Sequence, residues 1–571
     1  MLLIYLYFIL LVKIYLSDYF QQRYNFIDMF RSVGRFYSSI VLKKDTNQAH
    51  ELAKYAINFI SSGNPAPSVL ERTKMFHTDS VICGLSALAL KTNAPHVLRN
   101  EALETTLGKN PKVECAKVFG SSELVPIEKA IVANSSAVRE WDSNGTVFGY
   151  ANDAKRQAGE FGHNDFYPVV VAAAHVNKKI DGATALKAMT LQDEIRGRLC
   201  EVFSLKTYKI DHVVHGAIAS ICTYGALVEA KPEEIEHAIG MFVAHYIPWR
   251  AIRAGKQLSD SKGASAAIST EAAIMCIKRA MRGFVGPKDI FRNPESIFRF
   301  FENTSGDSPF DITLSNAGQD FAVMGMHFKL GLYEHQSAGA LEGLQKMIFD
   351  SKFTQNNKIE DIENINIVAY EPAFGIIGDP AKKTPKTRQS ADHSMVYIVS
   401  TILRKAFENN AFNSSLDKIN NLDEVWKTLM LEPSDYGYTA LFDAKTRSLM
   451  EKCSFSHGGK SYDEKYPEGI PTSISVTFKG NKKYDSGFVM FPSGHSRNST
   501  ANLKDILNYK NNLLGKIALS EKDLTDKLEQ LNKIDKLSNA DLQKLYECKI
   551  NVRKHSVDDK EFKEWMMIIL T

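Results

Sequence analysis

The chain has 571 residues, which is too long for one compact core and therefore predicts two domains. Its 44% hydrophobic and 24% charged residues are ordinary for a soluble globular protein, and a net charge of +4 without a basic stripe argues against a nucleic-acid partner. Seven scattered cysteines with no C-x-x-C pair indicate a reducing compartment and exclude a disulfide framework, a zinc ribbon and a four-cysteine iron–sulfur site.

The N-terminal segment has the features of a targeting sequence. Residues 1–12, "MLLIYLYFILLV", are apolar but shorter than the roughly 20 residues of a membrane span, and no positive region precedes them. Residues 29–44, "MFRSVGRFYSSIVLKK", contain four basic residues, three serines and no acid, as mitochondrial transit peptides do. We therefore predict an effective start at Met29, a targeting or extension segment over 1–45, and a mitochondrial mature protein that is not membrane-bound. A cytoplasmic protein is the alternative.

Residues 46–325 form the first part of a predicted helical domain. "KPEEIEHAIGMFVAH" (231–245) has apolar residues at helical spacing, a proline at its start and glutamates in the first turn. "GAIASICTYGALVEA" (216–230) and "GASAAISTEAAIMCIKRAM" (263–281) place Ala, Gly and Ser on apolar faces. Small residues let helix axes approach closely, so we expect tightly packed, largely buried helices.

The pattern changes to α/β over residues 326–497. "IENINIVAY" (362–370) alternates, and "SISVTFKGNKKYDSGFVM" (473–490) alternates and then turns at Gly480-Asn481, which predicts a hairpin. A helix is predicted between them in "HSMVYIVSTILRKAF" (393–407). Residues 498–571 become helical again, with Leu524, Leu528 and Leu531 on one face, and their many lysines predict a solvated surface.

"EFGHNDFYPVVVAAAH" (160–175) combines a polar turn with an alanine-rich apolar run. One interpretation is an ordinary helix start, with Asn164 or Asp165 as the cap and Pro168 in the first turn. The other is that His163 is held at a helix N-terminus, facing a pocket.

Several further polar groups lie in apolar surroundings rich in small residues. Each alone has a structural explanation, such as a helix cap, a snorkelling lysine or a hydrogen-bonded core histidine. Together, cationic groups at helix starts predict a pocket for a multiply charged carboxylate. No cysteine group or paired acidic cluster suggests a metal, and we predict neither a metal nor a cofactor. The candidates are Asp142, Thr146, His163, His212, Lys262, Lys329, His335, Tyr397 and His495.

In their order and spacing these motifs resemble the MmgE/PrpD family, which contains 2-methylcitrate dehydratase and cis-aconitate decarboxylase. The resemblance is collinear from about residue 68 to 550. The matching positions are Asp142 and Thr146 in D-x-x-x-T, Gly162-His163, Asp211-His212, Lys262, Lys329 with His335-Gln336-Ser337, His393 and Tyr397 in H-x-x-x-Y, and Pro492, Gly494 and His495 in P-x-G-H.

The sequence departs from the family pattern around the predicted pocket. Asn164-Asp165 replace the usual Pro-Ser after His163, and the gap between Thr146 and His163 is longer than usual. Gly145 stands where many members carry a second acid. These departures affect the substrate more than the fold.

The resemblance implies a mostly α protein with a large helical domain (46–325 and 498–571), a smaller α/β lid domain (326–497), a site in the cleft between them, and a homodimer. It also implies metal-independent dehydration of 2-methylcitrate to 2-methyl-cis-aconitate in propionate catabolism. The alternatives are decarboxylation of cis-aconitate to itaconate, epimerisation of a related polycarboxylate, or a helical partner protein without activity.

The implied roles follow from side-chain chemistry. His163 and His212 are acid and base in an order that stays open, because histidine titrates near neutrality. Asp142 orients one of them, and Lys262 with Lys329 holds substrate carboxylates. The predicted catalytic residues are His163, His212, Asp142, Lys262 and Tyr397, and the predicted substrate-binding residues are Thr146, Lys329 and His335.

Overall fold

The computed structural model describes residues 39–108, 111–151, 156–253, 257–302, 304–376 and 382–560. In this part the chain is mostly α-helical with small sheets, as predicted. Residues 1–38, with the predicted start at Met29 and most of the targeting segment, lie outside the described residues. In the described part no single helix is long and apolar enough to cross a bilayer; α3 (Pro67–Ala89) and α4 (Asn93–Glu104) meet that criterion only as a pair bent by 88°.

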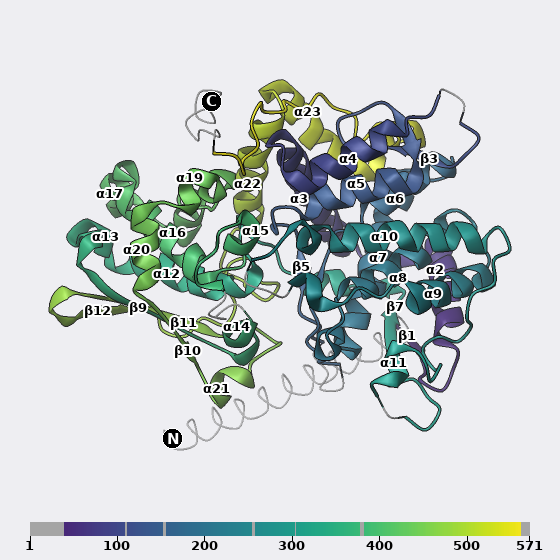
Figure 1. The fold of residues 1–571 in the computed structure, drawn as a ribbon, viewed down its shortest axis with the longest axis horizontal. Coiled ribbons are helices and arrows are strands. Elements are labelled where there is room, and N and C mark those ends of the chain that lie inside the picture. Colours follow the sequence, from purple (N-terminus) through teal and green to yellow (C-terminus); the bar gives the residue numbers. More distant parts are fainter. Residues whose placement is uncertain are drawn as a thin grey trace, which may run out of the picture.

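Packed helices form the part of the molecule drawn from purple to teal in Figure 1. The predicted small-residue helices lie at its centre, where α10 packs against α5, α8 and α9. At Gly225 of α8 a Cβ atom would lie 2.6 Å from Ile235 of α9, so glycine permits the close approach. The helices are α2 (Gln48–Ser62), α3 (Pro67–Ala89), α4 (Asn93–Glu104), α5 (Ile127–Arg139), α6 (Pro168–Val176), α7 (Gly182–Val202), α8 (Val213–Leu227), α9 (Pro232–His245), α10 (Asp260–Ala280) and α11 (Ile297–Phe300).

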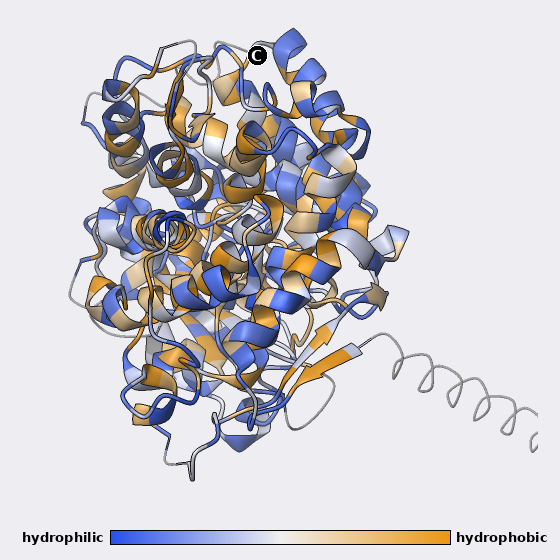
Figure 2. Ribbon diagram, turned by 90° about the vertical axis from the view of Figure 1, so that its right-hand side faces the viewer, coloured by the Kyte–Doolittle hydropathy of each residue, from blue (hydrophilic) through white to orange (hydrophobic). Residues whose placement is uncertain are grey.

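Short strand pairs connect these helices. β1 begins the described chain, appears mostly orange in Figure 2, and exposes Ile40 and Val41. Elsewhere in Figure 2 the helical ribbons change between orange and blue, as helices with one buried face do. The pairs are β1 (Ser39–Leu42) with β7 (Ile312–Ser315), β2 (Asn64–Pro65) with β8 (Ala317–Gly318), β3 (Cys115–Lys117) with β4 (Leu124–Pro126), and β5 (Thr146–Val147) with β6 (Gly162–His163).

A four-stranded sheet with the order β10-β9-β11-β12 organises the region drawn in green in Figure 1. β9 (Ile362–Ala369) pairs parallel with β10 (Cys453–His457) and antiparallel with β11 (Thr472–Phe478). β11 and β12 (Lys482–Asp485) form the predicted hairpin, and Gly480 in its turn has a φ of +78°. Ile365 and Ile367 are buried, because the alternating pattern turns one face of β9 inward.

Helices pack on and around this sheet, and α12 contacts β11 directly. The predicted helix at 393–407 is α16, which confirms that interpretation. The helices of this region are α12 (Ala338–Ser351), α13 (Phe353–Asn356), α14 (Glu371–Ile376), α15 (Arg388–Ala391), α16 (Met395–Glu408), α17 (Asn410–Ser415), α18 (Leu422–Thr428), α19 (Tyr438–Leu441), α20 (Ala444–Glu451) and α21 (Lys460–Asp463).

The end of the chain returns to its beginning. α22 (Leu503–Ala518) and α23 (Glu521–Asn532) pack against α3, and α24 (Asn539–Leu542) follows. Leu524 and Leu531 are buried as predicted, but Lys510 is fully buried and Lys527 nearly so. The prediction of a solvated lysine face is therefore wrong at these two positions, because each ammonium finds buried oxygen acceptors. The domain boundaries and the lid stay predictions.

Candidate active site

A cavity of about 70 Å³ lies where β5 and β6 meet the start of α8 and the 3-10 helix η4 (His335–Ser337). The predicted residues that line it are Asp142, Thr146, His163, His212 and His335. The other lining residues are Arg139, Phe148, Phe161, Arg250, Arg253, Glu334, Gln336 and His393. Lys262 and Lys329 lie behind this lining, where both contact Asp142.

His163 is held by a strand and not by a helix start. It belongs to β6, opposite Thr146 of β5, and the Thr146 hydroxyl donates a hydrogen bond of 3.0 Å to the carbonyl of Gly162. α6 begins at Pro168, as predicted, but neither proposed residue caps it. Asp165 instead accepts a hydrogen bond from Asn144, and Asn164 donates one to Ser80. The polar side chains of this turn therefore form hydrogen bonds that hold the cavity wall in place.

Steric crowding explains why a glycine stands at position 145. A Cβ atom at this position would lie 2.3 Å from the ring of Phe76, which stacks on Phe328 at a centroid distance of 3.8 Å. The second acid that many family members carry here has no room in this chain.

His163 and His212 face one another across the cavity. Their ring centroids are 5.3 Å apart, and His212 precedes the first turn of α8. Nδ1 of His163 and both ring nitrogens of His212 are buried without a hydrogen bond to any described residue, although Nδ1 of His212 lies 3.5 Å from Asp211. Burial, followed by nearby positive charge for His163, lowers the pKa of both imidazoles well below the usual value. Both rings are therefore neutral at pH 7 and able to accept a proton.

Asp142 is the centre of a buried charge cluster. Its φ is +51°, a conformation that aspartate tolerates better than most residues. Its carboxylate forms ion pairs with Arg139, with Lys329 and, at 3.3 Å, with Lys262. Burial opposes ionisation, but the charges of Arg139, Lys329 and Lys262 outweigh it and hold the pKa of Asp142 well below its usual value.

His393 joins two carboxylates. Its Nε2 lies 2.8 Å from Asp142 and its Nδ1 lies 2.6 Å from Asp392. These three residues have the donor atoms and the spacing of a metal site. The ammonium of Lys262, however, lies 3.3 Å from an oxygen of each carboxylate and already supplies a positive charge there. A divalent cation would have to displace Lys262.

Lys329 is positioned by a buried lysine from the C-terminal part. Its ammonium donates a hydrogen bond of 2.6 Å to the carbonyl of Asp142, and burial lowers its pKa to about 8. Lys510 of α22 donates to the carbonyls of Ser143 and Lys329 at 2.8 and 2.9 Å, and its charge is paired with Asp79 of α3. Lys510 therefore fixes both segments that hold the Asp142 cluster.

Glu334 is an acid of the cavity that sequence reasoning missed. Its carboxylate accepts a hydrogen bond from the backbone amide of Gln336, and no ion pair is formed to it within the described residues. Burial raises its pKa to about 8, so it is largely protonated at pH 7. Its position next to the predicted residue His335 is the feature of the sequence from which Glu334 could have been identified as a site residue.

Arg139 and Arg250 were also missed. Arg139 lies in the last turn of α5, three residues before Asp142, a spacing at which helical neighbours meet. Arg250 begins the 3-10 helix η2 (Arg250–Arg253), in a stretch with no motif of its own.

Tyr397 is not brought to the cavity. It lies on α16, and its hydroxyl donates a hydrogen bond of 2.6 Å to the backbone carbonyl of Asp435.

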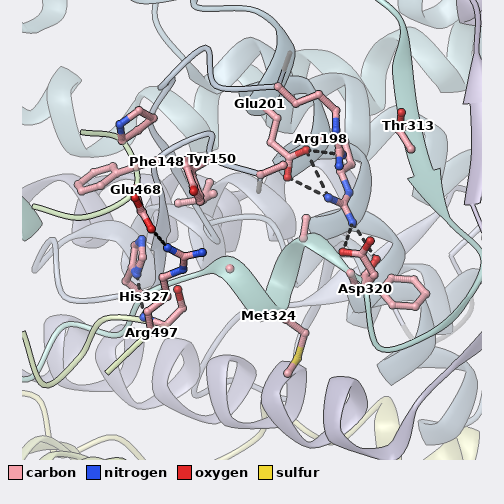
Figure 3. Close-up of a pocket in the computed structure, with 18 of the residues that line it drawn as sticks. Phe148, Tyr150, Arg198, Glu201, Thr313, Asp320, Met324, His327, Glu468 and Arg497 are labelled. Atoms are coloured by element: carbon pink, nitrogen blue, oxygen red, sulfur yellow. Dashed lines mark hydrogen bonds and ion pairs between the residues drawn. The ribbon is translucent and has the colours of Figure 1, made fainter. Parts of the chain in front are cut away.

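A second cavity, of about 580 Å³, lies on the other side of Phe148, which lines both cavities. Figure 3 shows its charged side chains joined to one another. Arg198 forms ion pairs with Glu201 at 3.0 Å and with Asp320 at 3.3 Å, and Arg497 pairs with Glu468. We call this space the outer cavity and the first one the inner cavity.

Neutral histidines, a protonated carboxyl and buried guanidinium groups around one cavity define a site for proton transfer on an anionic molecule. Residues 50–311 match the family model described as MmgE/PrpD N-terminal domain. The match covers a little under half of the chain and supports its membership of the MmgE/PrpD family, which the sequence motifs predict. Membership supports an enzyme of the dehydratase or lyase type and leaves the substrate undetermined.

Proposed function

We propose that this protein is a metal-independent hydro-lyase of a tricarboxylic hydroxy acid, and that it converts 2-methylcitrate to 2-methyl-cis-aconitate. The proposal rests on titratable groups of the inner cavity whose pKa values are shifted in opposite directions. His163 and His212 are neutral bases, whereas Glu334 is a neutral acid. Two kinds of titratable group whose pKa values are shifted in opposite directions are the usual sign of an acid and base pair.

The elimination requires one proton to be removed and one to be supplied. In our proposal one of the two histidines takes the proton from the carbon next to a carboxylate, and the C–H electron pair forms the double bond. The C–O bond breaks, and Glu334 gives its proton to the departing oxygen, which leaves as water. The proton then returns from the imidazolium to the Glu334 carboxylate by way of solvent, so the enzyme is regenerated.

The cluster around Asp142 supports this reaction from behind the cavity wall. Lys262, Lys329 and His393 are all engaged by Asp142 and fix the wall, and the two lysines add positive potential. Positive potential favours the charge that develops on the substrate carboxylate in the transition state.

A direct assay tests the proposal. The full chain is incubated with 2-methylcitrate, citrate and cis-aconitate, with and without a strong chelator, and the products are separated. We expect 2-methylcitrate to lose water at the same rate with chelator. Itaconate from cis-aconitate would instead establish a decarboxylase, an exchanged stereocentre would establish an epimerase, and a rate restored by added metal would contradict the metal-independent mechanism.

A further inference from the structure

The inner cavity is lined by buried nitrogen atoms that have no hydrogen-bond partner among the described residues. Buried polar atoms in proteins are nearly always paired, so unpaired ones that line a cavity are available to a bound molecule. These atoms are Nη2 of Arg139, Nδ1 of His163, both ring nitrogens of His212, Nη1 of Arg250, both ring nitrogens of His335 and Nε2 of Gln336.

Two of these atoms carry positive charge at every physiological pH. Arg139 is almost completely buried; its other nitrogens pair with Asp142 and, at 3.7 Å, with Asp165, which leaves Nη2 free of hydrogen bonds. Arg250 is half-buried, and no ion pair to its guanidinium is formed within the described residues. Its neighbour Arg253 is not comparable, because Asp211 holds it through two nitrogens.

Both guanidinium groups line the inner cavity together with His212. Each contributes positive charge that lowers the pKa of His212, together with Arg253. The predicted carboxylate clamps Lys262 and Lys329 are less suited to hold a ligand, since Asp142 already engages both. Guanidinium groups bind carboxylates through parallel hydrogen bonds, which gives strength and orientation.

We propose that Arg250 and Arg139 form an anion subsite, which binds one carboxylate of the substrate next to His212. This inference rests on the proposed function, because it assumes a polycarboxylate ligand. In this subsite the guanidinium group of Arg250 supplies a positive charge without an ion-pair partner among the described residues. Arg139 donates a hydrogen bond from Nη2 while it keeps its ion pair with Asp142. A substrate that lacks the third carboxylate would lose this contact.

Calorimetric titration with propane-1,2,3-tricarboxylate tests the subsite, because this probe has no hydroxyl group to eliminate. Glutarate serves as the matched ligand with one carboxylate fewer. We expect the wild type to bind the tricarboxylate about 10–100-fold more tightly than glutarate, the range of one charge-assisted hydrogen-bonded contact. We expect Arg250→Gln to remove most of that difference and Arg250→Lys to restore part of it.

The control is Arg282→Gln, which removes an exposed arginine that follows α10 and lies outside the cavity lining. Thermal melts of all variants establish that they are folded. If the wild type binds the tricarboxylate and Arg250→Gln binds it equally well, the subsite is wrong while the proposed function stands. If the folded wild type binds no tricarboxylate, the proposed function fails, and the subsite fails with it.

Discussion

The inner and outer cavities differ in two properties, their volume and the degree to which their polar groups are paired. The outer cavity is the larger, at about 580 Å³ against about 70 Å³, but its arginines are neutralised by the acids beside them. The inner cavity is small, and its histidines and two of its arginines keep nitrogen atoms without partners. Unsatisfied hydrogen bonding, and not volume, is the property on which we base the proposal that the inner cavity is the active site.

The two cavities also differ in whether they have room for a tricarboxylate. Ligand pockets commonly measure about 300–1,000 Å³, so the inner cavity must widen to admit a tricarboxylate. Phe148 lines both cavities, so a widening of the inner cavity at this ring would change the outer one as well.

The largest expected effect is that of His163→Gln on the rate. If His163 transfers a proton, turnover falls about 10²–10⁴-fold, while the free energy of unfolding changes by about 1 kcal/mol or less. Steady-state kinetics and thermal melts measure the two effects, and His245→Gln, an exposed histidine on α9, is the control. Nearly unchanged turnover in a normally melting variant would remove His163 from the mechanism and would weaken the distinction between the cavities.

Asp142→Asn tests the cluster behind the inner cavity. Asparagine keeps the shape and tolerates the positive φ, but leaves Arg139, Lys262 and Lys329 without their common anion. We expect the free energy of unfolding to fall by about 3–5 kcal/mol and turnover to fall about 10²-fold. Chemical denaturation and kinetics measure these changes. Asp320→Asn in the outer cavity is the matched control, and a similar loss there would contradict the comparison.

The pH profile of turnover should depend on Glu334. Its raised pKa, about 8, means that the proton donor is lost as the pH rises through about 8, so we expect turnover to decline there. The stability that comes from proton binding changes in the same direction: it is fully present below the ordinary pKa near 4.5 and is lost as the pH rises toward 8.

Glu334→Gln separates this acid from Lys329, whose pKa is also about 8. We expect the variant to lose about 10²-fold in turnover at pH 7 and to gain stability relative to the wild type above pH 8. Rate profiles and melts at several pH values provide the measurement. An unchanged rate at pH 7 would assign the alkaline decline to Lys329 and would exclude Glu334 as the donor.

The smallest expected effect is in the outer cavity. Arg497→Gln breaks the pair with Glu468, both of which are partly exposed, so we expect less than about 1 kcal/mol in stability and less than about twofold in turnover. A loss of activity comparable to that of His163→Gln would show that the larger cavity takes part directly in the reaction.

Local patterns in the sequence predicted local structure well. The alternating pattern predicted strands at β9 and β11, the turn at Gly480 predicted the hairpin of β11 and β12, and the proline and glutamates of 231–245 marked the start of α9. Those signals act between residues that are neighbours along the chain, so they are readable without tertiary contacts.

The site was predictable only in part, because its determinants are distant in sequence. Family motifs led to Asp142, His163 and His212, but nothing local shows that Lys262 is paired with Asp392 or that Glu334 has no ion-pair partner among the described residues. The same limit explains Lys510, which resembles the surface lysines around it until Asp79 is placed against it. Burial and pairing are properties of the folded chain.

The position of Lys510 has a consequence for how the molecule is made. Ribosomes deliver the chain from its N-terminus, so Asp79, Asp142 and Lys329 emerge long before α22 is available to join them. Until then Asp79 lacks its counter-charge, and the carbonyls of Ser143 and Lys329 lack their donor. A nascent or truncated chain that ends before α22 would hold most of the residues that line the inner cavity without the contacts of Lys510, so we expect the cavity to reach its final geometry only as synthesis is completed.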